Sequence, residues 1–437
     1  MDIVSARFGT AADFEKETGV SCDFQQLRMH GKTVTTVGGF MLLLLSPPND
    51  AGGRGSIDII IKENFELALM QYERLAEAVP AGKLPRTFEN GKLVTVDATD
   101  WTSGFFPGAL WYVYEYTRSP KWRRLALEFT RRTDAACGLT GTHDVGFMLY
   151  CGHGNALRLD GGKAHRDILL KGAGNLCRRF NPAAGCIRSW DFGETRWQFP
   201  VIIDNMMNLE LLMWAFRETG VQWYRDVAVS HAHRTLANHF RQDGSCYHVV
   251  DYDPESGLPI LKETYQGYAN ESAWARGQAW ALYGYTMMYR ETRNQVYLDQ
   301  AHRIARFILT HPRLPGDKIP LWDFDVPDAD SAPRDSSAAA IMASALIELS
   351  GYSASALAAH YIRIARAQLH ALSSEKYRAA VGENGGFILK QATGFRHRDS
   401  EVNAPLNYGD YYFLEALLRL RHVEESKKQH EIIEKPK

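Results

Sequence analysis

The sequence lacks several features that would assign it to a specialised class of protein. It has 50 Lys and Arg against 51 Asp and Glu, so it lacks the basic excess of a surface that binds duplex nucleic acid. Its six cysteines, at positions 22, 137, 151, 177, 186 and 246, include no CxxC pair. This spacing excludes a zinc ribbon and a dense disulfide framework, while the redox compartment stays open.

The sequence also lacks an apolar run long enough to cross a bilayer comfortably. The run that comes nearest, TVTTVGGFMLLLLS at 33–46, follows three basic residues and precedes two prolines, a pattern typical of the h-region of a signal peptide. Translation from Met29 would place such a peptide at about 29–50. The alternative is a buried N-terminal segment. The first interpretation predicts a periplasmic or secreted protein and the second a cytoplasmic one.

The composition is that of an ordinary globular protein, with 45% hydrophobic and 23% charged residues. A chain of this length buries about three quarters of its unfolded surface, so it needs no disulfide or metal to hold a core. Length alone favours about three domains. The internal pattern therefore has to decide the architecture.

Four segments repeat one pattern: an amphipathic helix, a break of a few residues and a second helix. They begin at Tyr112, Trp214, Met288 and Ile347, and a weaker fifth copy begins at Ala156. Because so short a break forces two helices to lie antiparallel, each copy is predicted to be a helical hairpin. Extending the hairpins predicts twelve helices and almost no strand, with helices at 62–79, 101–117, 121–135, 143–158, 163–180, 204–219, 222–240, 274–292, 295–311, 335–351, 354–372 and 408–421.

Five hairpins with one further helix at each end can close into a ring of six helix pairs. The first helix of each hairpin is the more apolar, as in NMMNLELLMWAF, and is expected on the inside, with its Arg-, Lys- and His-rich partner outside. The sequence therefore predicts an all-α (α/α)6 toroid at 56–422, after an N-terminal extension at 1–55 and before a polar tail at 423–437. An open solenoid is the alternative, which unequal and unevenly spaced repeats suit less well.

Inner helices that run parallel would begin on one face of the ring, and unusual residues cluster at those ends. Aromatic walls with a few charged groups are typical of a sugar-binding cleft, because aromatic faces pack on the apolar faces of pyranoses. The residues at these ends, or in loops that lead to them, include Trp101, Ser103, His143, Asp144, Trp190, Asp204, His248, Gln266, Arg276, Trp280 and Asp335.

Structural interpretations compete with this functional one. Asp144, Asp204 and Asp335 each precede an apolar run, where aspartate commonly caps a helix, and the tryptophans and histidines could belong to the core. The arrangement HDxxxxxxCxH from His143 matches no familiar metal-ligand spacing, so neither a metal nor another cofactor is expected. Convergence on one rim favours function, since independent caps would not require aromatic residues and Arg276 to gather there.

Longer motifs carry a resemblance to a known family. HDVGFMLY, IIDNMMNLELLMWA, QGYANESAWARGQAWALYGY, DWTSGFFPGALWYVYE and NYGDYYFLEALLRL resemble the unsaturated glucuronyl hydrolases of glycoside hydrolase family 88, in collinear order over about 57–422. The resemblance implies that the protein removes a 4,5-unsaturated uronate from the non-reducing end of lyase-generated oligosaccharides of the glycosaminoglycan type.

The resemblance also implies roles for individual residues. Asp204 matches the family's general acid/base, Asp144 its second essential carboxylate, and Arg276 a partner for the substrate carboxylate. The segment RHRDSEVNAPLN before Tyr408 matches the loop that receives the neighbouring sugar, although it indicates no sulfation preference. Relatives often carry a different small polar residue at position 103. The residues expected to bind substrate are Trp101, Ser103, His143, Trp190, His248, Gln266, Arg276 and Trp280.

The implied chemistry begins with protonation of C4 of a vinyl ether, and no displacement at C1 is needed. This requires a carboxyl that holds a proton near neutral pH. Asp204 follows Val-Ile-Ile, and its apolar surroundings and a nearby ionised Asp144 are expected to raise its pKa, whereas the helix N-terminus opposes the shift.

Other functions remain open at the level of sequence. The nearest is hydrolysis of unsaturated rhamnogalacturonides, which uses the same ring and acid. A sugar epimerase on a helical toroid, which relies on a histidine pair, and a carbohydrate-binding toroid without catalysis are further alternatives. The expected partner is an unsaturated oligosaccharide, with no nucleic acid, and the sequence does not fix the oligomeric state.

Overall fold

The computed structural model describes residues 25–29, 32–37, 40–41 and 54–433, with side chains over 57–426, and the chain forms two compact units, 1–57 and 58–437. In the first unit, β1 (Gln25–Met29), β2 (Lys32–Val37) and β3 (Phe40–Met41) pair into an antiparallel sheet. The signal peptide predicted at 29–50 overlaps these strands, and the rest of its residues lie outside the described ones. It stays a prediction.

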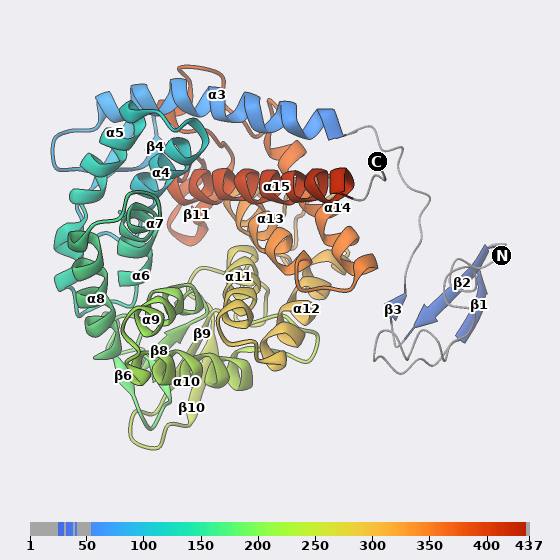
Figure 1. The fold of residues 1–437 in the computed structure, drawn as a ribbon. Coiled ribbons are helices and arrows are strands. Elements are labelled where there is room, and N and C mark those ends of the chain that lie inside the picture. The colour runs from blue at the N-terminus through green and yellow to red at the C-terminus, as the bar shows by residue number, and fades with distance from the viewer. Residues whose placement is uncertain (1–24, 30–31, 38–39, 42–53, 434–437) are drawn as a thin grey trace. The chain divides into compact units, whose positions relative to one another are not determined.

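The second unit is a double ring of helices, as predicted (Figure 1). Neighbouring inner helices contact one another around the ring, the first two through the aromatic pair Phe105–Phe147, and contact between the last and the first closes it. The inner ring consists of α4 (Phe105–Thr117), α6 (Val145–Leu149), α9 (Asn205–Thr219), α11 (Ala275–Thr292), α13 (Ser336–Ser350) and α15 (Asn407–Ile433). The outer helices are α3 (Arg54–Ala78), α5 (Pro120–Arg131), α8 (Lys163–Cys177), α10 (Gln222–His239), α12 (Gln295–Thr310) and α14 (Ser355–Leu372).

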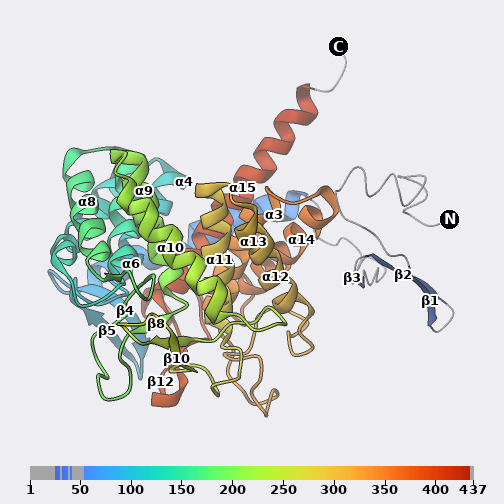
Figure 2. The same cartoon turned by 90° about the horizontal axis from the view of Figure 1, so that it is seen from below.

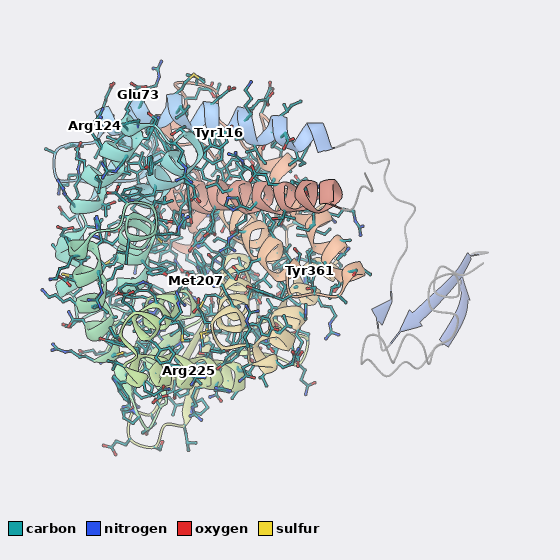
Figure 3. The ribbon with its side chains drawn as sticks, in the orientation of Figure 1. Glu73, Tyr116, Arg124, Met207, Arg225 and Tyr361 are labelled. Carbon is teal, nitrogen blue, oxygen red and sulfur yellow. The ribbon has the colours of Figure 1, made fainter. Side chains whose placement is uncertain are left out.

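Burial follows the apolar pattern of the sequence. In α11 every residue from Ala275 to Met288 is buried, as expected for a helix covered on all sides. By contrast, α5 buries only Trp122, Ala126, Phe129 and Thr130, at the spacing of one helix face. Side chains fill the ring, with Met207 of α9 inside it and Arg225 of α10 near its outer edge (Figure 3).

Three predicted helices differ most from the observed ones, and the one expected at 62–79 begins at Arg54 instead, as α3. The helix expected at 143–158 is divided into α6, a π-helical turn η2 (Tyr150–Gly154) and α7 (Asn155–Asp160). A π turn inserts one extra residue, which the apolar pattern does not reveal. The helix expected to end at 421 continues to Ile433, through most of the predicted tail, and projects from the ring (Figure 2).

The described residues also include short strands of two to six residues, which lie within loops and which the sequence pattern did not reveal. Figure 2 shows β4, β5, β8, β10 and β12 together on one side of the ring, opposite the projecting end of α15. This side carries the N-terminal ends of the inner helices. The pairs are β4 (Leu84–Glu89) with β5 (Lys92–Val96), β6 (Phe180–Asn181) with β7 (Cys186–Ile187), β9 (Val249–Tyr252) with β8 (Pro200–Ile202) and β10 (Pro259–Glu263), and β11 (Ala392–Phe395) with β12 (Ser400–Ala404).

The described part of the chain adds two observations to the sequence. Its five cysteines, Cys137, Cys151, Cys177, Cys186 and Cys246, are unpaired and buried. None of its helices combines the length and the apolar character that a bilayer span requires.

Candidate active site

Asp204 lies where the short strand β8 passes into the inner helix α9. The backbone N–H of Ile203 donates to the His248 carbonyl at 3.0 Å, which fixes the chain just before Asp204. Although Asp204 occupies the N-cap position of α9, its side chain makes no capping hydrogen bond. The residue is 7% exposed, and its Oδ2 is enclosed without a partner. The carboxyl is therefore not used to stabilise the helix.

The environment of Asp204 favours the protonated form. Burial raises its pKa to about 6, and the charge of Asp144 contributes in the same direction. His143 and Arg276 oppose the shift by favouring the carboxylate. The pKa of Asp204 is therefore raised, as expected from the sequence, and burial is the largest cause.

Asp144 is brought towards Asp204 by close packing of α6 on α9. The backbone N–H of Phe147 donates to Asn208 Oδ1 at 2.9 Å, and a Cβ at Gly146 would lie 2.6 Å from that oxygen. Asp144 also lacks a capping bond. Its carboxylate accepts a hydrogen bond from Thr142 Oγ1 at 2.8 Å and lies 3.2 Å from His143 Nε2.

His248 also approaches the Asp204 carboxyl. Its Nε2 is 3.7 Å from Asp204 Oδ2, and the side chain is 1% exposed. The backbone N–H groups of Tyr265 and Gln266 both donate to His248 Nδ1 at 3.1 Å. Gln266 is thereby placed next to the site through its backbone.

Arg276 is more engaged than the sequence indicated. Its Nη1 donates to Asp335 Oδ2 at 2.9 Å and to the Thr393 carbonyl, and its Nη2 donates to the Gly394 carbonyl at 2.7 Å. The guanidinium lies over the Trp274 ring at 4.5 Å, and only Nε lacks a partner. Asp335 is a true helix cap, since its Oδ1 accepts from the backbone N–H groups of Ser337 and Ala338.

The three predicted tryptophans lie in two aromatic groups. Trp190 is near His248, with ring centroids 6.5 Å apart, and Trp101 contacts Phe147 at 5.7 Å. Trp280 is fully buried and packs on Phe147 at 5.2 Å. Trp101 is thus the partly exposed ring of this aromatic group, and Trp280 packs behind it through Phe147.

Ser103 makes a structural bond. It is fully buried, and its hydroxyl donates to the Ala98 carbonyl at 2.9 Å within the turn that leads into α4. A role in binding substrate stays a prediction for Ser103, as it does for every other residue of the predicted set.

Sequence reasoning left three aromatic residues out of the predicted set. Tyr408 has a buried hydroxyl without a partner and contacts Trp101 at 5.0 Å. Phe192 is 51% exposed and stacks on Trp190 at 4.7 Å, and Tyr265 contacts both rings. The signal for Tyr408 was present, because it opens the last inner helix. Phe192, two positions after Trp190 and five before Trp197, gave no comparable signal.

Among the described residues, no group of three or more His, Cys, Asp or Glu side chains is arranged to hold a metal ion. The buried His153 and His165, whose Nδ1 atoms are 2.8 Å apart, lie on η2 and α8. This pair is separate from the residues around Asp204, which contain His143 and His248.

Comparison of the whole sequence with known proteins agrees with this arrangement of site residues. The family model described as Glycosyl Hydrolase Family 88 matches residues 187–420. A curated unsaturated glucuronyl hydrolase of Formosa agariphila is 44% identical over 348 residues, covering 79% of this chain and 86% of the relative. The chain belongs to glycoside hydrolase family 88. An unsaturated glucuronyl hydrolase of Bacillus sp. is 37% identical, over 76% of this chain and 89% of its own.

Solved structures of family 88 share the fold. An unsaturated glucuronyl hydrolase specific for heparin matches with a TM-score of 0.82 and 48% identity, covering 84% of this chain and 98% of its own. A variant of the Streptococcus agalactiae enzyme, in complex with dGlcA-GalNAc6S, matches with a TM-score of 0.70 and 29% identity over 83% and 91% of the two chains. The (α/α)6 barrel predicted from the sequence is thereby confirmed.

Proposed function

We propose that this family 88 hydrolase removes the 4,5-unsaturated uronate from the non-reducing end of glycosaminoglycan-derived oligosaccharides, with Asp204 as general acid and base. One observation carries the assignment of roles. Asp204 is a buried carboxyl at a helix N-terminus that neither caps the helix nor pairs with a cation, and its pKa is raised to about 6. A carboxyl in this environment is suited to proton transfer near neutral pH.

In the first step, Asp204 transfers its proton to C4 of the substrate. The O–H bond of the carboxyl breaks, a C–H bond forms at C4, and the electron pair of the C4=C5 bond is used. C5 then carries positive charge shared with the ring oxygen. The newly formed Asp204 carboxylate and Asp144, whose charge acts on Asp204, supply the negative charge that stabilises this cation.

In the second step, water attacks C5 and returns a proton to Asp204. The product is a hemiketal, whose ring opens to a ketone at C5 and a hemiacetal at C1. The hemiacetal then releases the neighbouring sugar as an alcohol. One water molecule is consumed, and Asp204 regains its starting state, so the same side chain serves as acid and then as base.

The experiment that tests this chemistry is reaction in heavy water with an unsaturated disaccharide. The proposal expects loss of the ultraviolet absorbance of the conjugated alkene and deuterium at C4 of the product. Both configurations at C4 in a freshly formed product would indicate displacement at C1 followed by tautomerisation of the released enol in solution, and would contradict the assignment of Asp204, whereas a single configuration supports it.

The activities of relatives support a glycosaminoglycan as the source of the oligosaccharide. The structure most similar among those described above is specific for heparin, and a Streptococcus pneumoniae relative named unsaturated chondroitin disaccharide hydrolase is 34% identical over 342 residues, 77% of this chain. Lyase products of heparin, chondroitin, hyaluronan and ulvan, tested side by side, would rank these sources. Unsaturated rhamnogalacturonides form the control, and faster turnover of these would favour the related pectin-directed activity.

A further inference from the structure

His248 and Asp204 face each other with atoms that have no other partner. His248 Nε2 and Asp204 Oδ2 are 3.7 Å apart, and both are enclosed without a hydrogen bond. His248 is held in place by two further contacts. Its ring centroid lies 4.6 Å from that of Trp274, and its backbone carbonyl accepts a hydrogen bond from the Ile203 N–H. The geometry therefore aims one specific nitrogen at one specific oxygen.

The proton position on His248 follows from its backbone contacts. Two N–H groups, those of Tyr265 and Gln266, donate to Nδ1, so this nitrogen must present a lone pair. The loop that supplies them is itself fixed, since Thr264 Oγ1 accepts from Gly267 and Asp323 Oδ2 accepts from Tyr268. The neutral ring consequently carries its hydrogen on Nε2, facing Asp204.

A second proton on His248 is disfavoured. Burial lowers its pKa well below the usual value, and the charges of Arg276, His239, His143 and Arg196 act in the same direction. His248 is therefore a fixed hydrogen-bond donor and does not exchange protons with the substrate.

We propose that His248 is a positioning residue whose Nε2–H donates to Asp204 Oδ2, so that the catalytic proton is held on Asp204 Oδ1. This proposal rests on the function proposed above. If Oδ2 carried the proton, two hydrogens would face each other across the gap. Oδ2 is enclosed, while the Asp204 side chain as a whole keeps 11% of its surface exposed. Transfer of the proton from Oδ1 to the substrate therefore also agrees with the accessibility of the two oxygens.

The same hydrogen bond assists the transfer itself. As Asp204 gives up its proton, negative charge develops on the carboxylate, and a bond from Nε2–H to Oδ2 becomes charge-assisted. Contacts of this kind are often long in the free enzyme and shorten along the reaction. His248 thereby stabilises the transition state more than the ground state, which raises kcat with little change in KM.

Two variants and a control test the proposal. His248→Met removes the donor at similar volume, and His248→Gln can accept from the loop with Oε1 while its Nε2 donates to Asp204. The control is His239→Gln, because the Nε2 of this buried histidine bonds the Val201 carbonyl at 3.0 Å. The readouts are kcat, KM and the alkaline limb of the pH profile of kcat/KM. All three are measured from the loss of ultraviolet absorbance of an unsaturated disaccharide.

His248→Met is expected to lower kcat about 100-fold, at the lower end of the range found for loss of a single preorganised donor. Its alkaline limb should move to higher pH, because the Asp204 carboxylate loses a stabilising bond while His143, Arg276 and Asp144 remain. His248→Gln should recover most of both changes, and His239→Gln should leave the limb in place. Equal losses in both His248 variants with an unmoved limb would overturn the proposal.

Nitrogen NMR of the wild-type protein gives an independent test that needs no variant. A lone-pair shift for His248 Nδ1 and a protonated shift for Nε2 support the proposal, and the reverse assignment overturns it. Wild-type activity and a single deuterated configuration at C4 are tested separately. Their failure would reject the proposed function, whereas their success with a negative result here would reject the role of His248 alone.

Discussion

Asp204 and Asp335 occupy the same position at the start of two inner helices and have opposite roles in the structure. Asp335 is fully buried, caps α13 with Oδ1 and pairs with Arg276 through Oδ2. Asp204 is almost as buried, yet it neither caps α9 nor has a partner for Oδ2. A buried carboxyl costs stability unless its oxygens are bonded. The comparison supports a structural role for Asp335 and the proposed catalytic role of Asp204.

The largest effect is expected when Asp204 is changed to Asn. The fold should persist, because no helix cap is lost, while turnover of an unsaturated disaccharide falls by at least about two orders of magnitude. Loss of ultraviolet absorbance measures this directly. Near-normal turnover would show that the proton comes from another group.

Asp335→Asn should act mainly on stability. Asparagine keeps an oxygen for the helix cap, but the ion pair with Arg276 is lost, and the guanidinium retains only the carbonyls of Thr393 and Gly394. We expect the free energy of unfolding to fall by about 2–3 kcal/mol, somewhat less than for a fully stranded charge. Urea denaturation measures it. An unchanged midpoint would contradict a structural role for Asp335.

The stability of the wild-type protein should depend on the ionisation of Asp204. Its pKa is about 6 in the fold against an ordinary value of 3.8 for aspartate, so the folded state binds the proton more tightly than the unfolded state. Stability from this group is therefore full below pH 4 and is lost as pH rises through 6, by about 1–3 kcal/mol. Above pH 6, Asp204→Asn should be more stable than wild type, opposite in sign to Asp335→Asn. Thermal unfolding of both variants at two pH values decides this.

A smaller effect tests how Asp144 acts on Asp204. Gly146→Ala places a Cβ against Asn208 and should push α6 away from α9, at a cost of about 1–3 kcal/mol. With Asp144 farther away, the alkaline limb of kcat/KM should move slightly to lower pH. Gly174→Ala is the matched control, because a Cβ there meets nothing within 4 Å and should stabilise α8. Equal pH profiles in the two variants would exclude this coupling.

The ring and most helix boundaries could be predicted because apolar spacing directly reflects burial. For α9, α11 and α13 the predicted start lies one residue before the observed one. Short strands such as β6 and β8, with two and three residues, offer no alternation to detect. The π turn in η2 depends on packing between helices and leaves no periodic signal.

The site could be predicted only as a set of residues gathered at one rim. Asp204 and Asp335 read alike in the sequence, since each precedes an apolar helix. Their difference depends on Arg276, which lies 59 residues before Asp335 and bonds that residue alone of the two. The fixed tautomer of His248 depends on a loop 17 and 18 residues away, and this contact exists only in the folded chain.

The most direct test is a titration of the Asp204 carboxyl by carbon NMR, assigned from the spectrum of Asp204→Asn and compared with the pH dependence of kcat/KM. That dependence reports the ionisation of the free enzyme. The account predicts that Asp204 titrates with a pKa of about 6 and that kcat/KM falls as pH rises through the same value. Titration of Asp204 near its usual value, with activity undiminished well above it, would contradict the account.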